Sequence, residues 1–491
     1  MGTMFCKCSS LKSINLQNFK ISLVFIMDSM FYECSSLETI DISKFNTSLV
    51  TNMRYMFYKC SSLTSINLSK WNTSSLLNML SMFSLCSSLI SIDLSNFNTS
   101  LVYNMESIFD GCISLKSINL TNFNTSSVTN MESMFFECSS LESIDLSSFD
   151  TSSVVIMRFM FYGCSLLESI NLANFDTSLV TDMGSMFSGC KSLKFINLSK
   201  FNTSSVNYMG EIFSKCSSLK SIDLSSFNTS FVTSFYSIFS ECYSLKYIDL
   251  SNFNTFSVNN LGAMFYKCSS LEIINLSNFN TSSVTSFYNM FYECKSLKSI
   301  NLSNFDTSSV RQMDYMFYGC DSLNFLDLSN FNMLNCISYL NMFSKVNNLS
   351  YINLYNFQGD KNISQFFNLK DKLYVCQSNN IISYPNVYNC CDFNYESNKC
   401  NLENGTSIVT VINQSYIIRD TEINIDTSIG TITSQTYIIK DTEINRDTSV
   451  ETYNNRNPNI GDNDVYQDKE DESNDNIPGT KLSKASSSKM P

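Results

Sequence analysis

The sequence contains no histidine among its 491 residues. Histidine is the commonest general base and metal ligand, so its absence excludes Ser-His-Asp and Cys-His catalytic sites. Basic residues are also few, 32 against 44 acidic ones, which gives a net charge of -12. Nucleic acid binding needs clustered cations, so we expect no nucleic acid partner. No apolar run is long enough to span a membrane. We therefore expect a non-enzyme without a catalytic residue, a cofactor or a membrane-spanning segment.

A sequence motif of 26 residues is repeated through most of the chain. Its clearest marker is a cysteine that recurs every 26 residues without insertion or deletion, and Val346 occupies the fourteenth place. Such a period predicts a solenoid, because one repeat cannot bury its own apolar side chains and has to stack on its neighbours. The recurring cysteines are Cys8, Cys34, Cys60, Cys86, Cys112, Cys138, Cys164, Cys190, Cys216, Cys242, Cys268, Cys294 and Cys320.

The first half of each repeat has the pattern of a short strand. Leu141, Ile144 and Leu146 follow the L-x-x-I-x-L spacing of the strand in a leucine-rich repeat, in which the last two point inward. The residues between them then point outward, because side chains alternate along a strand. We expect one such strand in each repeat, paired in parallel with its neighbours.

The second half has the spacing of one helix face. After a turn, apolar residues follow at intervals of three, three, one and three, as in Val154, Met157, Met160, Phe161 and Cys164. This spacing predicts a short α-helical or 3₁₀ segment. The sequence as a whole therefore predicts an α/β solenoid, a leucine-rich-repeat-like right-handed coil with one short parallel strand and one short helical segment in each 26-residue repeat.

These motifs resemble those of a known family. The segments CSSLESIDLSSFDTSSV, from Cys138, and TNMESMFFEC, which ends there, resemble the 26-residue bacterial surface protein repeat of the BspA-like leucine-rich repeat proteins. The resemblance covers roughly residues 1–357. It implies display at the cell surface or secretion, adhesion to host matrix or other cells, and no catalytic residue. Because Met1 opens inside a repeat without a secretory signal, a cytoplasmic location is expected if that start is genuine.

The composition divides the chain into four parts. Residues 1–357 form the solenoid of about fourteen repeats, and 358–400 are expected to be a C-terminal cap. In an exported protein, up to two disulfides would brace this cap, with three possible pairings. Residues 401–453 contain a 21-residue repeat in two copies, which form either paired strands or a linker, and 454–491 form a polar, acidic tail expected to be disordered. The cap cysteines are Cys376, Cys390, Cys391 and Cys400.

Neither repeated column of possible metal ligands predicts a metal site. One cysteine per coil offers no cluster of four ligands, so a buried structural thiol is favoured over a redox role. A column of single Asp or Asn residues, such as Asp145, also supplies too few oxygens for calcium. We expect it to support the stack instead.

The candidate binding site consists of bulky apolar residues that replace serine at outward strand positions. Exposed apolar groups in a row mark contact surfaces more often than chance would. The alternatives are drift in a permissive repeat and cover by the cap. The candidate ligand-binding residues are Phe195, Tyr247, Ile273, Phe325, Tyr351 and Tyr355.

Two functions follow from these patterns. The first is a cell-surface adhesion protein that binds protein or glycan ligands through one solenoid face. The second is an intracellular protein-interaction scaffold. Disulfides among the cap cysteines in protein from native cells would favour the first. An enzyme is a distant third, because no residue departs from the repeat in a way that suggests catalysis.

Overall fold

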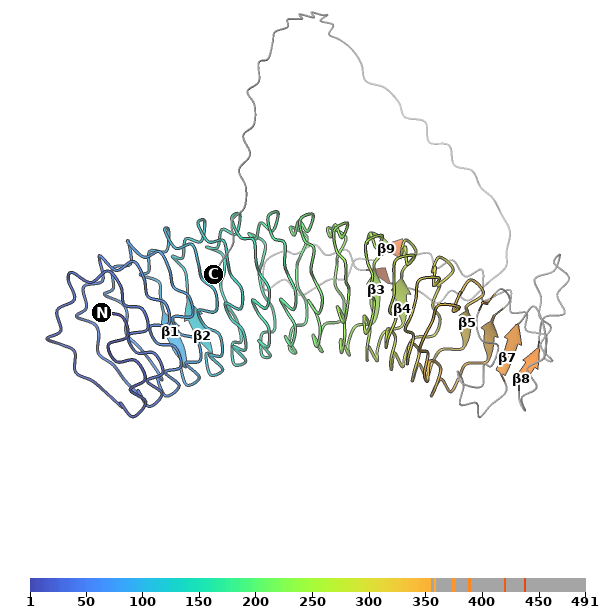
Figure 1. Cartoon of the computed structure of the whole chain (residues 1–491), viewed down its shortest axis with the longest axis horizontal. Helices are drawn as coiled ribbons and strands as arrows, with labels where there is room; N and C mark the ends of the chain where they lie inside the picture. Colours follow the sequence, from blue (N-terminus) through green and yellow to red (C-terminus); the bar gives the residue numbers. More distant parts are fainter. Residues whose placement is uncertain (355–356, 359–372, 377–386, 390–418, 421–436, 439–491) are drawn as a thin grey trace, which may run out of the picture. The chain divides into compact units, whose positions relative to one another are not determined.

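The computed structural model describes residues 1–354, 357–358, 373–376, 387–389, 419–420 and 437–438. The chain divides into two compact parts, Met1–Val409 and Thr410–Pro491. In the first part, successive repeats form similar coils that stand side by side in chain order (Figure 1). The stacking partner of each coil is therefore the next repeat, as the fixed period predicts.

Short parallel strands link neighbouring coils at the L-x-x-I-x-L motif. In β1 (Ser91–Asp93) and β2 (Ser117–Asn119), Ile92 pairs with Ile118. The same register joins β3 (Tyr247–Asp249) to β4 (Ile273–Asn275) and β5 (Phe325–Asp327) to β6 (Tyr351–Asn353). The offset equals one repeat, so equivalent residues of successive coils lie in columns.

The predicted helical segment is wrong, because turns occupy its place. In the segment that begins at Met157, the N–H groups of Phe159 and Phe161 donate to carbonyl oxygens of the next coil, at 3.0 and 2.9 Å, whereas that of Tyr162 closes a turn onto Phe159. Phe159 and Gly163 have positive φ angles of 59° and 72°, outside the helical region. No residue is helical in the part of the chain that the structure describes. Strands occupy the L-x-x-I-x-L motif in six of the described repeats rather than in each one, so the coils are built mainly of turns.

The turns still bury the apolar face that the helix was expected to bury. Met157, Met160, Phe161 and Cys164 are all fully buried. At the position of Phe161, rings of successive coils from Phe5 to Phe343 stack with centroids 5.3 to 5.9 Å apart. Aromatic stacking and apolar burial therefore stabilise every contact between coils.

A buried threonine in the N-F-N-T-S motif joins the coils at a second corner. The hydroxyl of Thr125 donates to the carbonyl oxygen of Asp150 at 2.7 Å and accepts the N–H of the same residue at 2.8 Å. Thr125 is fully buried. Because a buried polar group is costly without a partner, this reciprocal pair fixes the register of neighbouring coils.

Strands also occur beyond residue 357. In the region expected to be the cap, β7 (Leu373–Cys376) pairs in parallel with β6, and β8 (Val387–Asn389) pairs with β7. In the second part, β9 (Arg419–Asp420) pairs antiparallel with β10 (Tyr437–Ile438), one strand from each copy of the 21-residue repeat. Cys376 ends β7, whereas Cys390, Cys391, Cys400 and the expected tail lie outside the described residues.

Candidate functional site

The predicted ligand-binding residues lie on one column of the strand face, apart from Tyr355. We call this the strand column, and it holds a small hydroxyl residue in most coils. Its members are Ser13, Thr39, Ser65, Ser91, Ser117, Ser143, Ser169, Phe195, Ser221, Tyr247, Ile273, Ser299, Phe325 and Tyr351. Large apolar side chains therefore begin at the eighth coil and continue, with two serine interruptions, to the fourteenth.

The structure brings four of these residues together in two pairs. Tyr247 is in register with Ile273, and Phe325 with Tyr351. The rings of the second pair stack with centroids 5.1 Å apart and planes 4° apart. Phe195 stands alone beyond Ser221 and is 57% exposed. The column thus offers one exposed ring and two apolar pairs rather than a continuous stripe.

The C-terminal end of the strand column is covered. Tyr351 is only 8% exposed, and it is in register with Tyr374 of β7. Because Tyr351 is buried and its ring stacks on Phe325, it offers little surface to a ligand. Tyr355 lies outside the described residues. The open part of the column runs from Phe195 to Phe325.

Carboxylates and amides of the neighbouring Asp and Asn column are held within their own coils. Asp145 accepts the N–H of Ser147 at 2.9 Å, and hydrogen bonds from Ser147 lower the pKa of this carboxyl group. Asn67 accepts both the N–H and the hydroxyl of Ser69. In the described ranges, no three His, Cys, Asp or Glu residues are grouped to hold a metal ion. The column forms turns that end the strands.

The cysteine column lies inside the stack. From Cys34 to Cys320, each recurring cysteine is buried, and the Sγ of Cys164 donates to the carbonyl oxygen of Phe135 at 3.2 Å. Burial raises the pKa of the Cys190 and Cys242 thiols to about 12. Such thiols are protonated and inert at neutral pH, since the thiolate is the reactive form.

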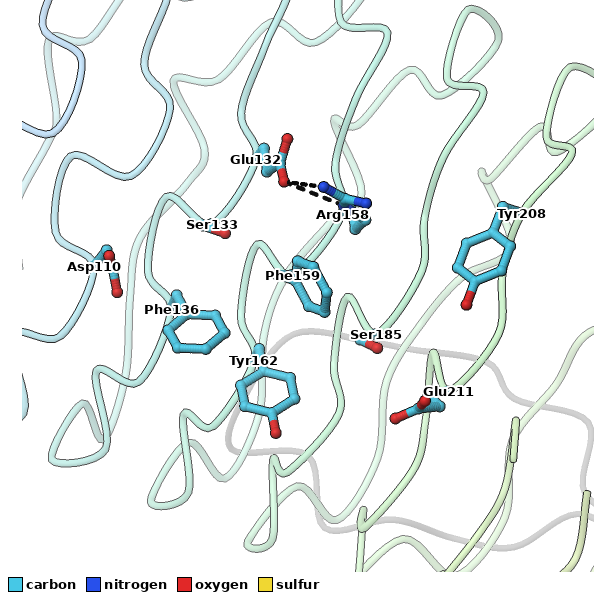
Figure 2. A pocket seen from close by; sticks show the side chains of 10 residues that line it. All are labelled: Asp110, Glu132, Ser133, Phe136, Arg158, Phe159, Tyr162, Ser185, Tyr208 and Glu211. Carbon is cyan, nitrogen blue, oxygen red and sulfur yellow. Dashed lines mark hydrogen bonds and ion pairs between the residues drawn. The ribbon is translucent and has the colours of Figure 1, made fainter. Parts of the chain in front are cut away.

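An open pocket of about 600 Å³ lies on the turn segments of the coils, where the sequence had predicted no site (Figure 2). An aromatic trio, Phe136, Phe159 and Tyr162, lines its centre. Phe136 and Tyr162 stack at 4.7 Å, and Phe159 meets both edge-on, at 6.1 and 5.9 Å. Its other lining residues are Asp110, Glu132, Ser133, Arg158, Ser185, Tyr208 and Glu211.

An ion pair forms one wall of this pocket. The Arg158 Nε donates to Glu132 Oε1 at 3.1 Å and lies 3.9 Å from Asp182 Oδ2. Hydrogen bonding to Glu132 raises the pKa of the Arg158 guanidinium group. Figure 2 shows this pair beside Phe159, with Tyr208 and Glu211 at one end of the pocket and Asp110 at the other.

Two glycines make room for Tyr208. A Cβ atom on Gly184 would clash with Tyr208 Cε1, and one on Gly210 would lie 3.0 Å from its hydroxyl oxygen. The residue two before the recurring cysteine is aromatic in half of the fourteen coils, so Phe136 and Tyr162 alone gave no signal for the pocket. Only their combination with Phe159 and the serines beside it marks this place.

Several solved structures of leucine-rich repeat proteins are similar to this chain. A leucine-rich repeat protein from Bacteroides ovatus is 21% identical, with a TM-score of 0.47 over 76% of this chain and 86% of that one. A leucine-rich cell surface protein from Faecalibacterium prausnitzii is 20% identical, with a TM-score of 0.32 over 56% and 76%. A leucine-rich repeat protein from Eubacterium ventriosum is 18% identical, with a TM-score of 0.26 over 51% and 81%.

No curated protein matches this chain. Within the described ranges, no helix has the length and apolar character to cross a membrane. The model of one family, described as Mycoplasma protein of unknown function, DUF285, matches residues 1–92, 86–194, 164–273 and 259–379. These matches cover the whole array of repeats and confirm the family resemblance drawn from the 26-residue period. The chain belongs to the DUF285 family of repeat proteins.

Proposed function

We propose that the protein is a non-enzymatic cell-surface adhesion protein that binds protein or glycan ligands of a host or matrix through the strand column. The observation that carries this proposal is the set of large apolar residues from Phe195 to Phe325 on a column that holds serine or threonine in each of the first seven coils. Aromatic side chains are enriched at contact surfaces, because they combine a large apolar area with few rotatable bonds.

The repeated coil favours binding that uses many weak contacts. Phe195, the pair of Tyr247 with Ile273, and Phe325 place apolar groups at intervals of two and three coils along the open part of the strand column. A ligand with repeated features, such as a fibrous matrix protein or a polysaccharide, engages several of these groups together. Avidity then exceeds the affinity of any one contact.

The decisive variant is Phe195→Ser, alone and combined with Tyr247→Ser. Serine occupies the strand column in the coils next to Phe195, at Ser169 and Ser221, so the coil tolerates this change. We expect attachment to a panel of immobilised matrix proteins and glycans to fall at least tenfold, with an unchanged thermal midpoint for the single variant.

The matched control is Phe231→Ser, because Phe231 is 65% exposed but lies outside the strand column. Attachment that is unchanged in both Phe195 variants, or equally reduced by the control, would contradict the proposal. Labelling of intact native cells with an impermeant reagent tests location. Labelling only after lysis would favour the intracellular scaffold instead.

A further inference from the structure

The aromatic trio that lines the pocket resembles two other clusters of three rings on the turn segments of the described coils. The others are Tyr32, Tyr55 and Tyr58, and Tyr292, Tyr315 and Tyr318. In each cluster, two rings of neighbouring coils stack at 4.7 to 4.8 Å and a third meets them edge-on. The same arrangement in three places makes their differences informative.

Three basic side chains of the chain lie over the faces of aromatic rings on the turn segments. The Nζ of Lys267 lies 5.0 Å from the ring centroid of Tyr266, and that of Lys345 lies 5.2 Å from that of Tyr318. The guanidinium carbon of Arg158 lies 5.1 Å from the centroid of Phe159. A cation over an aromatic ring is attracted by the ring quadrupole.

The lysine position is different around the aromatic trio. Lys59, Lys267 and Lys345 all immediately precede the place of the recurring cysteine in their coils. In the four coils around the trio, this place holds Gly111, Glu137, Gly163 and Gly189. No lysine of the chain therefore reaches the Phe136 and Tyr162 rings from this position.

Charge on the pocket wall is predominantly negative. Glu132 neutralises Arg158, which is the one basic residue among the lining groups. Asp110 and Glu211, at opposite ends, form no ion pair within the part of the chain that the structure describes. Burial raises the pKa of Asp110, as expected for a carboxyl group that lacks a nearby cation.

We infer that this pocket binds an extended basic peptide of a partner protein, whose lysine or arginine side chains lie on the Phe136 and Tyr162 rings and approach Asp110 and Glu211. The two carboxylates are four coils apart, which corresponds to on the order of 20 Å. An extended peptide covers that distance in about six residues. The pocket is separate from the strand column, so this inference can fail without loss of the proposed function.

The test uses a fluorescent nonapeptide of serine and glycine with lysines at its second, fourth and eighth positions, and the same peptide with all of its lysines acetylated. Fluorescence anisotropy with the full chain should show binding of the first that weakens as salt is added, and at least tenfold weaker binding of the second. Equal binding of both peptides, or no binding of either, would overturn the inference.

Two variants locate the binding site. Gly163→Lys places a lysine where Lys59 and Lys267 occur, next to Glu137, just as Lys267 follows Glu241 one coil earlier. Lys267 adopts a φ of 58° at this position, so lysine tolerates the backbone there. This in-chain cation should reduce peptide binding at least tenfold. Phe159→Ser, which copies Ser133 and Ser185, should do the same.

The control is Tyr315→Asn in the third cluster, which copies Asn289 and Asn341 of the adjacent coils. It should leave peptide affinity within twofold of the parent chain. Equal losses in Tyr315→Asn and Phe159→Ser would overturn the assignment to this pocket. So would unchanged affinity in Gly163→Lys, provided that its circular dichroism spectrum matches that of the parent.

Discussion

Interior and outward columns of the same coils follow opposite rules. Inside, a ring at the position of Phe161, a thiol at that of Cys164 and a hydroxyl at that of Thr151 recur almost without change, and all are buried except Phe5 and Cys8 of the first coil. Outside, the strand column changes from serine to phenylalanine, tyrosine or isoleucine between neighbouring coils. Stability therefore resides in the residues that repeat, and the binding residues that we propose are the ones that depart from the repeat.

Packing explains this difference. An interior side chain contacts its equivalents in two neighbouring coils, so a change in volume disturbs two interfaces at once. An outward side chain such as Phe195 meets solvent, and its replacement costs the coil little. Each of the following predictions tests whether the two kinds of column are as independent as this contrast implies.

The largest expected effect is the response of the interior cysteine column to high pH. Burial raises the pKa of Cys190 and Cys242 to about 12, whereas thiols of an unfolded chain ionise near roughly pH 8.5. Above that pH, the unfolded chain loses protons that the folded chain retains. The free energy of unfolding then falls by about 1.4 kcal/mol per pH unit for each buried thiol, until the folded pKa is reached.

We expect the coils to unfold between about pH 9 and pH 12 in the presence of reductant, as measured by circular dichroism. Cys190→Ala combined with Cys242→Ala should reduce the slope of unfolding free energy against pH by about 3 kcal/mol per unit. Slopes that are equal in the variant and the parent would show that the thiols do not govern alkaline unfolding.

A cavity in the interior ring column should have the next largest effect. Phe161→Ala removes a fully buried ring that stacks on Phe135 and Phe187 at 5.5 and 5.7 Å. We expect a loss of about 3 to 5 kcal/mol in the free energy of unfolding, measured by urea denaturation. A loss below about 1 kcal/mol would mean that neighbouring coils collapse into the space, and the interior would then be as tolerant as the surface.

The reciprocal threonine bonds should contribute less. Thr125→Val keeps the shape of the side chain but removes both hydrogen bonds to Asp150, which leaves a backbone N–H without its partner. We expect a loss of about 1 to 3 kcal/mol in the free energy of unfolding. Thr125→Ser is the control, since it retains the hydroxyl. If the serine variant is less stable than the valine variant, the methyl group of Thr125 contributes more to stability than its hydrogen bonds to Asp150.

The repeat itself could be predicted from the sequence, because the cysteine period and the apolar spacing specify which residues are inside. Leu141, Leu146, Val154 and Phe161 are all buried as predicted, and Ile144 is partly buried. The same spacing led to the wrong prediction of a helical segment. Turns that form backbone hydrogen bonds to the next coil bury the same positions as one face of a helix. Glycine immediately before some cysteines, as at Gly163, was the available signal for a positive φ.

The candidate site was less predictable, for a related reason. Spacing along one repeat identifies the outward positions. The exposure of a side chain at such a position, however, depends on the residues of the neighbouring coils. Tyr351 is buried although its place in the repeat is an outward one. The pocket needed Phe159 between two serines, Ser133 and Ser185, in adjacent coils. Such combinations exist only once the coils are aligned.

The smallest expected effect comes from extending the strand column. Ser221 is exposed and separates Phe195 from Tyr247, so Ser221→Phe joins them into one apolar run. The free energy of unfolding should change by less than about 0.5 kcal/mol, because the new ring is outside the coil. The ligand to use is the one whose attachment Phe195→Ser reduces. Its attachment should become tighter by about two- to tenfold, the typical gain from one aromatic pair.

Ser143→Phe is the matched control, because Ser143 is equally exposed and has serine on both sides of it in the strand column. It should leave both stability and attachment unchanged. If Ser143→Phe and Ser221→Phe strengthen attachment equally, any exposed ring suffices and position on the column carries no information. If Ser221→Phe lowers stability by more than about 1 kcal/mol, outward and interior columns are coupled, and departures from the repeat cannot be separated from the packing that holds it together.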